Sequence, residues 1–316
     1  MKKTFINKKI VKHLFILNLL LYCMITESPC IAQIKITDAH TPIPLVNDDV
    51  YHAIAQFLEY DRNIPLDAKI IYKDEFEGST REKIVFTGVN NSKVPAFLVI
   101  PNDNVATHPV VFLIDGIYGS KDRWFQDNSW PKGGLAAKAL LNNGFAIMTL
   151  DAVYHGERSY ENDYEIEPWP GQFPYQARHM ILQTTIEYRR ALDYLATRKD
   201  IDTTRIGSLG LSMGGLITFQ LTSIDSRIKS AVAGLTPIGK AKEFQPWLPS
   251  TYANRVNCNS FLMFMGNKDT VYTMKDAYEL FDLIPIDQKE FIEYNVGHDP
   301  PIEYVKKITN WFLDKL

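Results

Sequence analysis

One serine of the chain has the sequence surroundings of a serine nucleophile. Ser212 lies in Gly210-Leu-Ser-Met-Gly-Gly215, after an apolar run and before residues compatible with a helix. In a Gly-x-Ser-x-Gly pattern the serine occupies a strained strand-to-helix turn, and glycines are needed because side chains there would strike the neighbouring backbone. A serine hydroxyl becomes a nucleophile when a base removes its proton, so the stretch indicates acyl-transfer chemistry.

A serine of this kind needs a histidine and an acid, and both occur later in the chain. Asp269 and His298 each follow an apolar, strand-like run. The histidine would accept the hydroxyl proton, and the acid would fix its tautomer and stabilise its charged form. Asp299 and Glu293 are alternative acids close to His298, although neighbours on one loop rarely face the imidazole nitrogen that is turned away from the serine.

The elements that must position these residues follow from the hydrophobic pattern. From residue 108 onward, continuous apolar runs alternate with helical patterns, which is typical of a parallel sheet covered on both faces. Three shorter runs before it follow one another without helices, which indicates antiparallel strands. Strands are expected at 68–72, 83–88, 94–101, 108–115, 145–151, 205–211, 228–235, 261–265 and 290–294, and helices within 46–60 and at 134–143, after Ser212, and at 176–198, 274–283 and 302–316. The predicted fold class is α/β, a mostly parallel doubly wound sheet with antiparallel N-terminal strands.

The first residues differ in kind from the rest. Five lysines precede the apolar run 14–25, which is followed by a polar stretch ending at Ala32. This is the pattern of a cleavable signal peptide over 1–32, cut after Ala32, so the protein is expected to be secreted or periplasmic, without stable membrane insertion after cleavage. A lipid anchor at Cys30 is the alternative. The remainder, 33–316, is expected to be a single catalytic domain with an N-terminal extension over 33–107.

Composition narrows the classes of partner. A chain of 316 residues with 46% hydrophobic and 22% charged residues can bury one substantial core. Its net charge of −3 becomes more negative without the first lysines, which argues against a nucleic-acid partner. Beyond residue 32 the only cysteine is Cys258, expected as a buried, inert thiol. The histidines do not have the spacing of zinc ligands, and the glycine-rich turn around Ser212 lacks the lysine of a phosphate-binding loop. No metal or other cofactor is therefore expected.

Several short motifs occur in the order found in a known superfamily. The chain resembles α/β-hydrolases, in particular the branch with dienelactone hydrolases, acetyl-xylan-type esterases and the catalytic domains of prolyl-oligopeptidase-like enzymes. The resemblance runs from about Val110 to the C-terminus and rests on Asp193-Tyr-Leu, Ile201-Asp-Thr-Thr-Arg-Ile-Gly, Gly210-Leu-Ser-Met-Gly-Gly215, Asp225-Ser-Arg-Ile, Gly266-Asn-Lys-Asp269 and Gly297-His298. It implies that Ser212 is the nucleophile, His298 the general base and then acid, and Asp269 the group that orients His298.

Acyl transfer also needs two donors where negative charge develops on the carbonyl oxygen. We expect the backbone N–H of Met213, at the start of the helix after Ser212, and that of Ile117 in Asp115-Gly-Ile-Tyr-Gly119. Many relatives have His-Gly where this chain has Asp115-Gly116. A carboxylate at this place would oppose the developing oxyanion unless it is turned away or paired.

Aromatic and histidine side chains in the long loops are candidates for the substrate pocket. Tyr118, His155, Trp169 and Trp247 fall in segments expected near the carboxyl ends of the strands, where ligands bind in such sheets. The alternatives are a loop histidine bonded to the backbone, for His155, and packing of long loops, for the aromatic residues.

The expected function is a secreted serine hydrolase that cleaves carboxylic esters, with a small-molecule or carbohydrate-linked ester as substrate. A serine peptidase of the prolyl-oligopeptidase-like type and a catalytically silent binding protein on the same fold are the alternatives.

Overall fold

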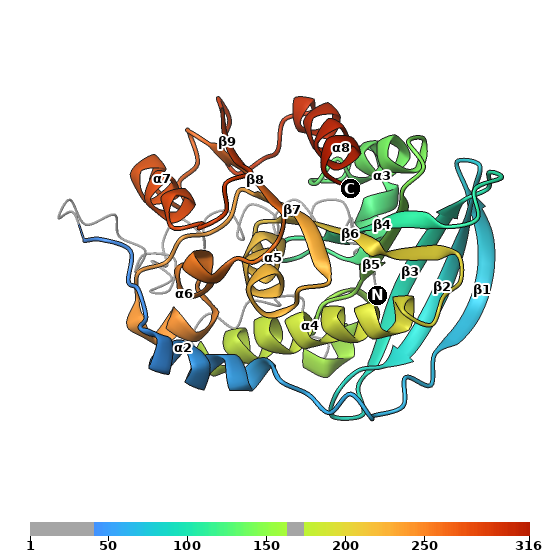
Figure 1. Cartoon of the computed structure of the whole chain (residues 1–316), viewed down its shortest axis with the longest axis horizontal. Coiled ribbons are helices and arrows are strands. Elements are labelled where there is room, and N and C mark those ends of the chain that lie inside the picture. The colour runs from blue at the N-terminus through green and yellow to red at the C-terminus, as the bar shows by residue number, and fades with distance from the viewer. Residues whose placement is uncertain (1–40, 163–173) are drawn as a thin grey trace, which may run out of the picture. The chain divides into compact units, whose positions relative to one another are not determined.

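The structure is a computed structural model that describes residues 41–162 and 174–316. Its described part contains a nine-stranded sheet in the order β1-β2-β3-β5-β4-β6-β7-β8-β9 (Figure 1). The strands are β1 Lys69–Phe76, β2 Ser79–Thr87, β3 Lys93–Pro101, β4 His108–Ile114, β5 Ala146–Leu150, β6 Ile201–Leu211, β7 Ile228–Gly234, β8 Ser260–Gly266 and β9 Lys289–Tyr294.

The sheet changes character along its width. The pairs β1–β2, β2–β3 and β3–β5 are antiparallel, and every pair from β5–β4 to β8–β9 is parallel. Every residue of β4, β5 and β8 is buried, which is why these strands are continuous apolar runs in the sequence. The predicted fold class, with antiparallel N-terminal strands, is confirmed.

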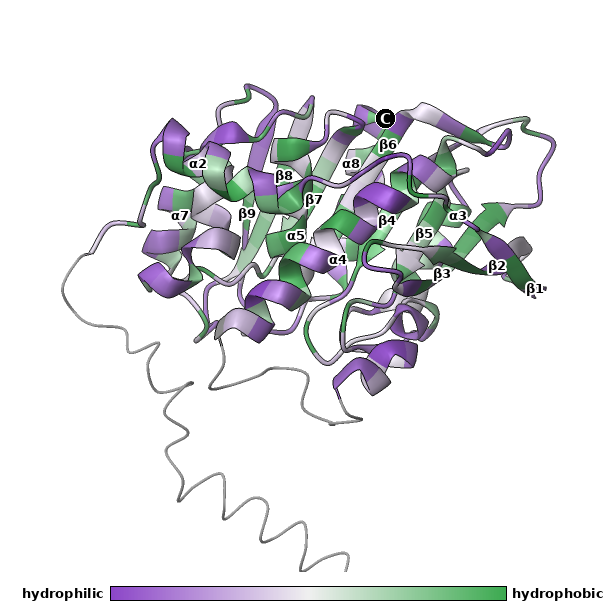
Figure 2. Ribbon diagram, turned by 90° about the horizontal axis from the view of Figure 1, so that it is seen from below, coloured by the Kyte–Doolittle hydropathy of each residue, from purple (hydrophilic) through white to green (hydrophobic). Residues whose placement is uncertain are grey.

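Helices cover both faces of the sheet, and the alternation of side chains along β4 separates two cores. Val110, Phe112 and Ile114 belong to the core beneath α2, α4, α5 and α7, whereas Val111 and Leu113 belong to the core beneath α3 and α8. Figure 2 shows hydrophobic colouring along the central strands, while the outer turns of α4 and α7 are largely hydrophilic. The helices are α2 Asp48–Ala55, α3 Gly133–Leu141, α4 Pro174–Leu195, α5 Met213–Ile224, α6 Pro249–Tyr252, α7 Met274–Asp282 and α8 Glu303–Lys315.

The sequence pattern missed the short helical turns after residue 120, whereas Gln56–Leu58 falls within the helix expected over 46–60. The structure has 3-10 helices η1 Gln56–Leu58, η2 Lys121–Phe125, η3 Gly156–Asn162, η4 Lys242–Trp247 and η5 Ala253–Arg255. With α6, the last two occupy the segment 236–257, for which the sequence showed no period. Elements of three to six residues are too short to display a helical repeat of apolar residues.

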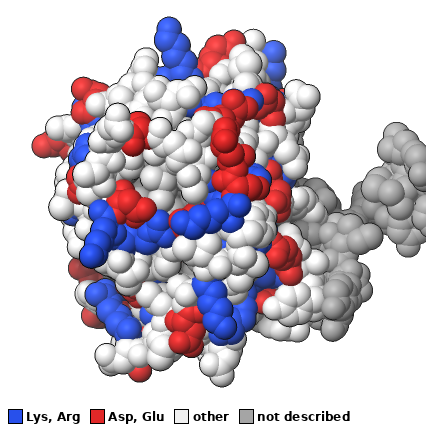
Figure 3. Space-filling view, turned by 90° about the vertical axis from the view of Figure 1, so that its right-hand side faces the viewer, with Lys and Arg blue, Asp and Glu red and all other residues white. Residues whose placement is uncertain are grey.

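Charges on the sheet-edge face that carries β1 are interspersed. Figure 3 shows Lys and Arg side chains beside Asp and Glu side chains on this face. Two ion pairs join β1 to β2: Lys73 Nζ lies 2.7 Å from Oε1 of the buried Glu82, and Arg81 Nη2 lies 2.5 Å from Asp74 Oδ2. Opposite charges therefore tie the edge strand to its neighbour.

The sequence predicted that Cys258 is a buried thiol. Cys258 is buried, as expected, and burial raises the pKa of its thiol to about 12. Within 41–162 and 174–316, no helix combines the length and apolar character needed to cross a membrane. The expected signal peptide and its cleavage after Ala32 lie outside the described residues, as does Trp169.

Candidate active site

Ser212 lies at the tight turn between β6 and α5. Its backbone has φ of +54° and ψ of −116°, a conformation that residues with a side chain rarely adopt. The turn is so tight that a Cβ on Gly210 would collide with the backbone of Gly214, and a Cβ on Gly214 would collide with the carbonyl of Ile114. The two glycines of the motif are thus required by close backbone approach, as the sequence pattern predicted.

The structure brings Ser212, His298 and Asp269 together. His298 Nε2 lies 2.9 Å from Ser212 Oγ, and His298 Nδ1 lies 2.6 Å from Asp269 Oδ2. The Asp269 side chain is fully buried, and its other oxygen accepts a hydrogen bond from the Val271 N–H at 2.9 Å. A buried carboxylate held in this way orients the imidazole with Nε2 toward the serine, which is the arrangement that acyl transfer requires.

The alternative acids have other partners. Asp299 Oδ1 lies 3.2 Å from Lys132 Nζ. Glu293 accepts hydrogen bonds from Asn267 Nδ2 at 2.8 Å and from the Tyr278 hydroxyl at 2.6 Å. Neither carboxylate is the partner of His298 Nδ1.

Trp130 is a further side chain of this site, and the sequence did not predict its contact with His298. Trp130 stacks on the His298 ring at 5.7 Å between centroids, and its Nε1–H donates to the His298 carbonyl at 2.8 Å. A Cβ on Gly116 would lie 3.1 Å from the Trp130 ring and 3.2 Å from Ser212 Cβ. Trp130 therefore lies between the His298 loop and the turn after β4. Its sequence position gives no signal of this role, because the contact joins segments 168 residues apart.

The turn after β4 contains a backbone donor between two engaged neighbours. The Ile117 N–H has no hydrogen-bond acceptor among the described residues, whereas the N–H groups of Gly116 and Tyr118 have one each. Four N–H groups of this turn donate to nearby acceptors: Gly116 to Asp115 Oδ1 at 2.7 Å, Tyr118 to His155 Nε2 at 3.3 Å, Gly119 to the Gly116 carbonyl at 3.1 Å, and Lys121 to Asp151 Oδ1 at 2.9 Å. Met213, the second expected donor, is the first residue of α5, where backbone N–H groups have no partner within the helix.

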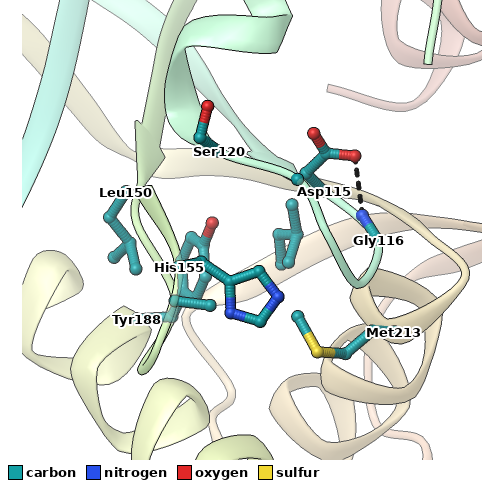
Figure 4. A pocket seen from close by; sticks show the side chains of 10 residues that line it. Asp115, Gly116, Ser120, Leu150, His155, Tyr188 and Met213 are labelled. Atoms are coloured by element: carbon teal, nitrogen blue, oxygen red, sulfur yellow. Dashed lines mark hydrogen bonds between the residues drawn. The ribbon is translucent and has the colours of Figure 1, made fainter. Parts of the chain in front are cut away.

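One oxygen of the Asp115 carboxylate is hydrogen-bonded, and the other, Oδ2, is buried without a hydrogen-bond partner among the described residues. Figure 4 shows the carboxylate pointing away from Met213 and His155 while it accepts the Gly116 N–H. Arg123 Nε lies 3.5 Å from Asp115 Oδ2. Burial raises the pKa of the Asp115 carboxyl to about 6, so the negative charge is costly at this place. The carboxylate therefore points away from Met213 and lies beside the Arg123 side chain.

A second buried carboxylate binds the end of the turn after β4. Asp151, directly after β5, accepts hydrogen bonds from the Lys121 N–H and from the Glu157 N–H. Its Oδ2 also lies 2.7 Å from Lys121 Nζ, and neither side chain is exposed. Lys83 lies beside this pair, and burial together with the nearby Lys121 lowers the pKa of Lys83 to about 8. The ion pair fixes the end of the turn to the loop after β5.

The candidates for pocket lining have different surroundings. A small cavity is lined by Ile114, Asp115, Gly116, Gly119, Ser120, Leu150, Ala152, His155, Tyr188 and Met213 (Figure 4). Of the expected residues, His155 lines it. Tyr118 has a side chain 56% exposed on the adjoining turn. Trp247 is buried in the apolar core, 5.1 Å from the Phe244 ring, and is absent from this cavity lining.

Residues 41–162 and 174–316 contain no group of three or more His, Cys, Asp or Glu side chains arranged to hold a metal ion.

Fold and site together define a member of the α/β-hydrolase superfamily: a mostly parallel sheet with helices on both faces and a serine at a strand-to-helix elbow. The family model of acetyl xylan esterase (AXE1) matches residues 46–238. The chain belongs to this family.

Individual relatives are distant. YtaP of Bacillus subtilis (strain 168) is 25% identical over 172 residues, which are 53% of this chain and 56% of that protein, so the chain spans about half of that relative's length. Among solved structures, the acetyl xylan esterase from Paenibacillus sp. R4 has a TM-score of 0.67 at 17% identity, over 87% of this chain and 97% of that one. Acetyl xylan esterase 1 from Thermoanaerobacterium sp. JW/SL YS485 has a TM-score of 0.64 at 14% identity, over 86% and 94%. At these identities the structural likeness shows the fold.

Proposed function

We propose that this protein is a serine hydrolase that cleaves carboxylic esters through an acyl-enzyme. The observation that carries the proposal is the continuous contact from Asp269 through His298 to Ser212 Oγ, at 2.6 Å and 2.9 Å. Membership of the acetyl xylan esterase family supports an ester as substrate.

The proposed reaction follows from the geometry. Ser212 Oγ attacks the ester carbonyl while His298 Nε2 accepts the hydroxyl proton, and the buried Asp269 carboxylate stabilises the imidazolium. The N–H groups of Ile117 and Met213 donate to the oxyanion of the tetrahedral intermediate. His298 then protonates the leaving alcohol. A water molecule, deprotonated by His298, attacks the acyl-enzyme, the bond between the acyl carbon and Ser212 Oγ breaks, and His298 returns the proton to Oγ as the carboxylic acid leaves.

The cavity favours a short acyl group. Its apolar members Ile114, Leu150 and Met213 are buried, and Asp115 and Tyr188 bound the same small space. If the acyl group enters this small space next to Met213, an acetyl group fits better than a long chain. We therefore propose acetyl esters of small molecules or carbohydrates as the substrate class.

The test is a kinetic panel on the full mature chain and on Ser212→Ala. We expect the wild type to hydrolyse p-nitrophenyl acetate faster than the butyrate and octanoate esters and to release acetate from acetylated xylan, and Ser212→Ala to lose this activity. Hydrolysis of aminoacyl amides in preference to every ester would instead support a peptidase. A wild type without turnover on any substrate of the panel would contradict the proposal.

We also propose that the protein is exported, because residues 1–32 have the basic, apolar and small-residue pattern of a signal peptide. N-terminal sequencing of exported protein should begin at Gln33. A mature N-terminus at a lipid-modified Cys30 would replace this proposal with membrane anchoring.

A further inference from the structure

The turn that carries Ile117 has a backbone conformation that its own sequence does not favour. Residues 116–119 form a β-turn closed by the hydrogen bond from the Gly119 N–H to the Gly116 carbonyl. Its third residue, Tyr118, has φ of +65°. Turns with a positive φ at the third position usually have Gly or Asn there, because a larger side chain is crowded in this conformation. With tyrosine at this position, the turn depends on support from outside.

His155 supplies a contact of this kind from the loop after β5. Its Nε2 lies 3.3 Å from the Tyr118 N and its Nδ1 lies 2.8 Å from the Val153 carbonyl oxygen. A carbonyl accepts hydrogen bonds and a backbone N–H donates them, so both contacts form when Nδ1 carries the proton and Nε2 has the lone pair. The imidazole is 3% exposed, and burial lowers the pKa of His155, which favours this neutral form.

The contact engages one of the two backbone N–H groups on either side of Ile117. It engages the Tyr118 N–H on the side of the loop after β5, while Asp115 engages the Gly116 N–H. The Ile117 N–H between them remains for a substrate. The turn itself lies against the nucleophile, because a Cβ on Gly116 would be 3.2 Å from Ser212 Cβ. Figure 4 shows the His155 ring between the β5 side of the cavity and Met213.

We propose that His155 is a positioning residue: through its hydrogen bond to Tyr118 it fixes the turn 116–119 so that the Ile117 N–H faces the oxygen of an ester carbonyl at Ser212. This inference rests on the proposed function, because the oxyanion belongs to that reaction. His155 itself does not touch the reacting atoms.

Two amide substitutions test the two hydrogen bonds of the His155 ring one at a time. In His155→Asn the terminal amide reaches the place of Nδ1, so it can donate to Val153 but leaves Tyr118 without an acceptor. In His155→Gln the terminal amide reaches the place of Nε2 and can accept the Tyr118 N–H. We expect His155→Asn to lower kcat about 100-fold, as for a displaced oxyanion donor, with KM within about 3-fold of the wild type. His155→Gln should lose only about 5-fold in kcat, since it retains the acceptor.

The kinetics of both variants are measured with p-nitrophenyl acetate, and their thermal unfolding is measured alongside. The inference is overturned if His155→Asn keeps kcat within about 5-fold of the wild type, or if both variants lose kcat equally, since a role in folding alone does not distinguish the two amides. The wild type and Ser212→Ala are measured in the same assay to test whether the protein hydrolyses esters through Ser212. A wild type without ester hydrolysis would contradict the proposed function but would leave the position of the His155 ring untested by kinetics.

A second measurement needs no variant. Nitrogen-15 NMR of the His155 ring in the wild type between pH 6 and pH 8 should show the neutral form with the proton on Nδ1, and the Tyr118 amide should be protected from hydrogen exchange. A ring protonated on Nε2, or a charged ring, would overturn the inference even if both amide variants failed to fold.

Discussion

The two halves of this site are held in different ways. Ser212, His298 and Asp269 contact one another directly, so the side chains that would react also fix each other's positions. In the other half, the group proposed to donate to the oxyanion is the Ile117 N–H, a backbone group that cannot fix its own position. Side chains of other residues hold it there: Asp115 and His155 engage the neighbouring N–H groups, and Asp151 and Lys121 anchor the end of the turn.

The difference shows which residues specify each half of the site. A catalytic side chain is specified by its own residue type, and the motif around it follows from local backbone sterics. A backbone donor can belong to any residue, so its placement is encoded in the buried polar groups around it. Substitutions in the first half should therefore affect the reaction directly, whereas substitutions in the second half should act through geometry and stability.

The largest effect is expected for the acid of the triad. Asp269→Asn should lower kcat about 10⁴-fold, because the amide donates to His298 Nδ1 and favours the wrong imidazole tautomer. Asp299→Asn and Glu293→Gln are matched controls at neighbouring carboxylates and should stay within about 3-fold, as their present partners are Lys132, Asn267 and Tyr278. Steady-state kinetics decide the matter; a 10⁴-fold loss at either control would assign the acid differently.

The next largest effect is expected for the buried ion pair of Lys121 and Asp151, at the end of the turn after β4. Lys121→Met should destabilise the fold by about 3–5 kcal/mol, because it leaves the fully buried Asp151 carboxylate without its counter-ion. Lys132→Met removes the ion pair with the exposed Asp299 and should cost less than about 1 kcal/mol. Urea unfolding measures both, and equal losses would show that burial of the Lys121 pair is unimportant.

The carboxyl of Asp115 should make stability depend on pH. Its pKa is raised from an ordinary value of 3.8 to about 6, so the folded state binds the proton more tightly than the unfolded state. The stabilisation is complete below pH 3.8 and is lost as pH rises through 6, by about 3 kcal/mol in total. Asp115→Asn cannot lose a proton, so its free energy of unfolding relative to the wild type should rise by about this amount from pH 4 to pH 7. A difference that is constant with pH would show that Asp115 has an ordinary pKa.

The smallest effect is expected at Trp130. Trp130→Phe keeps an aromatic ring on His298 but removes the donor to the His298 carbonyl, so kcat should fall about 5–10-fold, in line with one hydrogen bond of about 1 kcal/mol. Trp130→Leu also removes the stacked ring and should be slower still. Phe and Leu variants with wild-type kcat would show that Trp130 only fills space.

The sequence predicted the fold well where burial is continuous. Strands such as β4 and β8 are uninterrupted apolar runs because helices cover both faces, and the antiparallel start follows from short strands without intervening helices. The short helices of 236–257 were missed because they have no repeat to detect.

For the site, the sequence predicted the serine, histidine and aspartate that the structure places in contact, since their types and order are typical of the fold. It did not predict that Trp130 stacks on His298, that Asp115 turns away, or that His155 contacts the turn. These depend on segments far apart in the chain, and no local spacing encodes them.

The central claim is that Ser212 is the nucleophile of an acyl-enzyme. Its most direct test is reaction of the mature protein with a fluorophosphonate, followed by peptide mass spectrometry. We predict a single adduct on Ser212 that forms in the wild type and is slowed about 10⁴-fold in His298→Ala. An adduct on another residue, or ester hydrolysis that continues with Ser212 unmodified, would contradict the account.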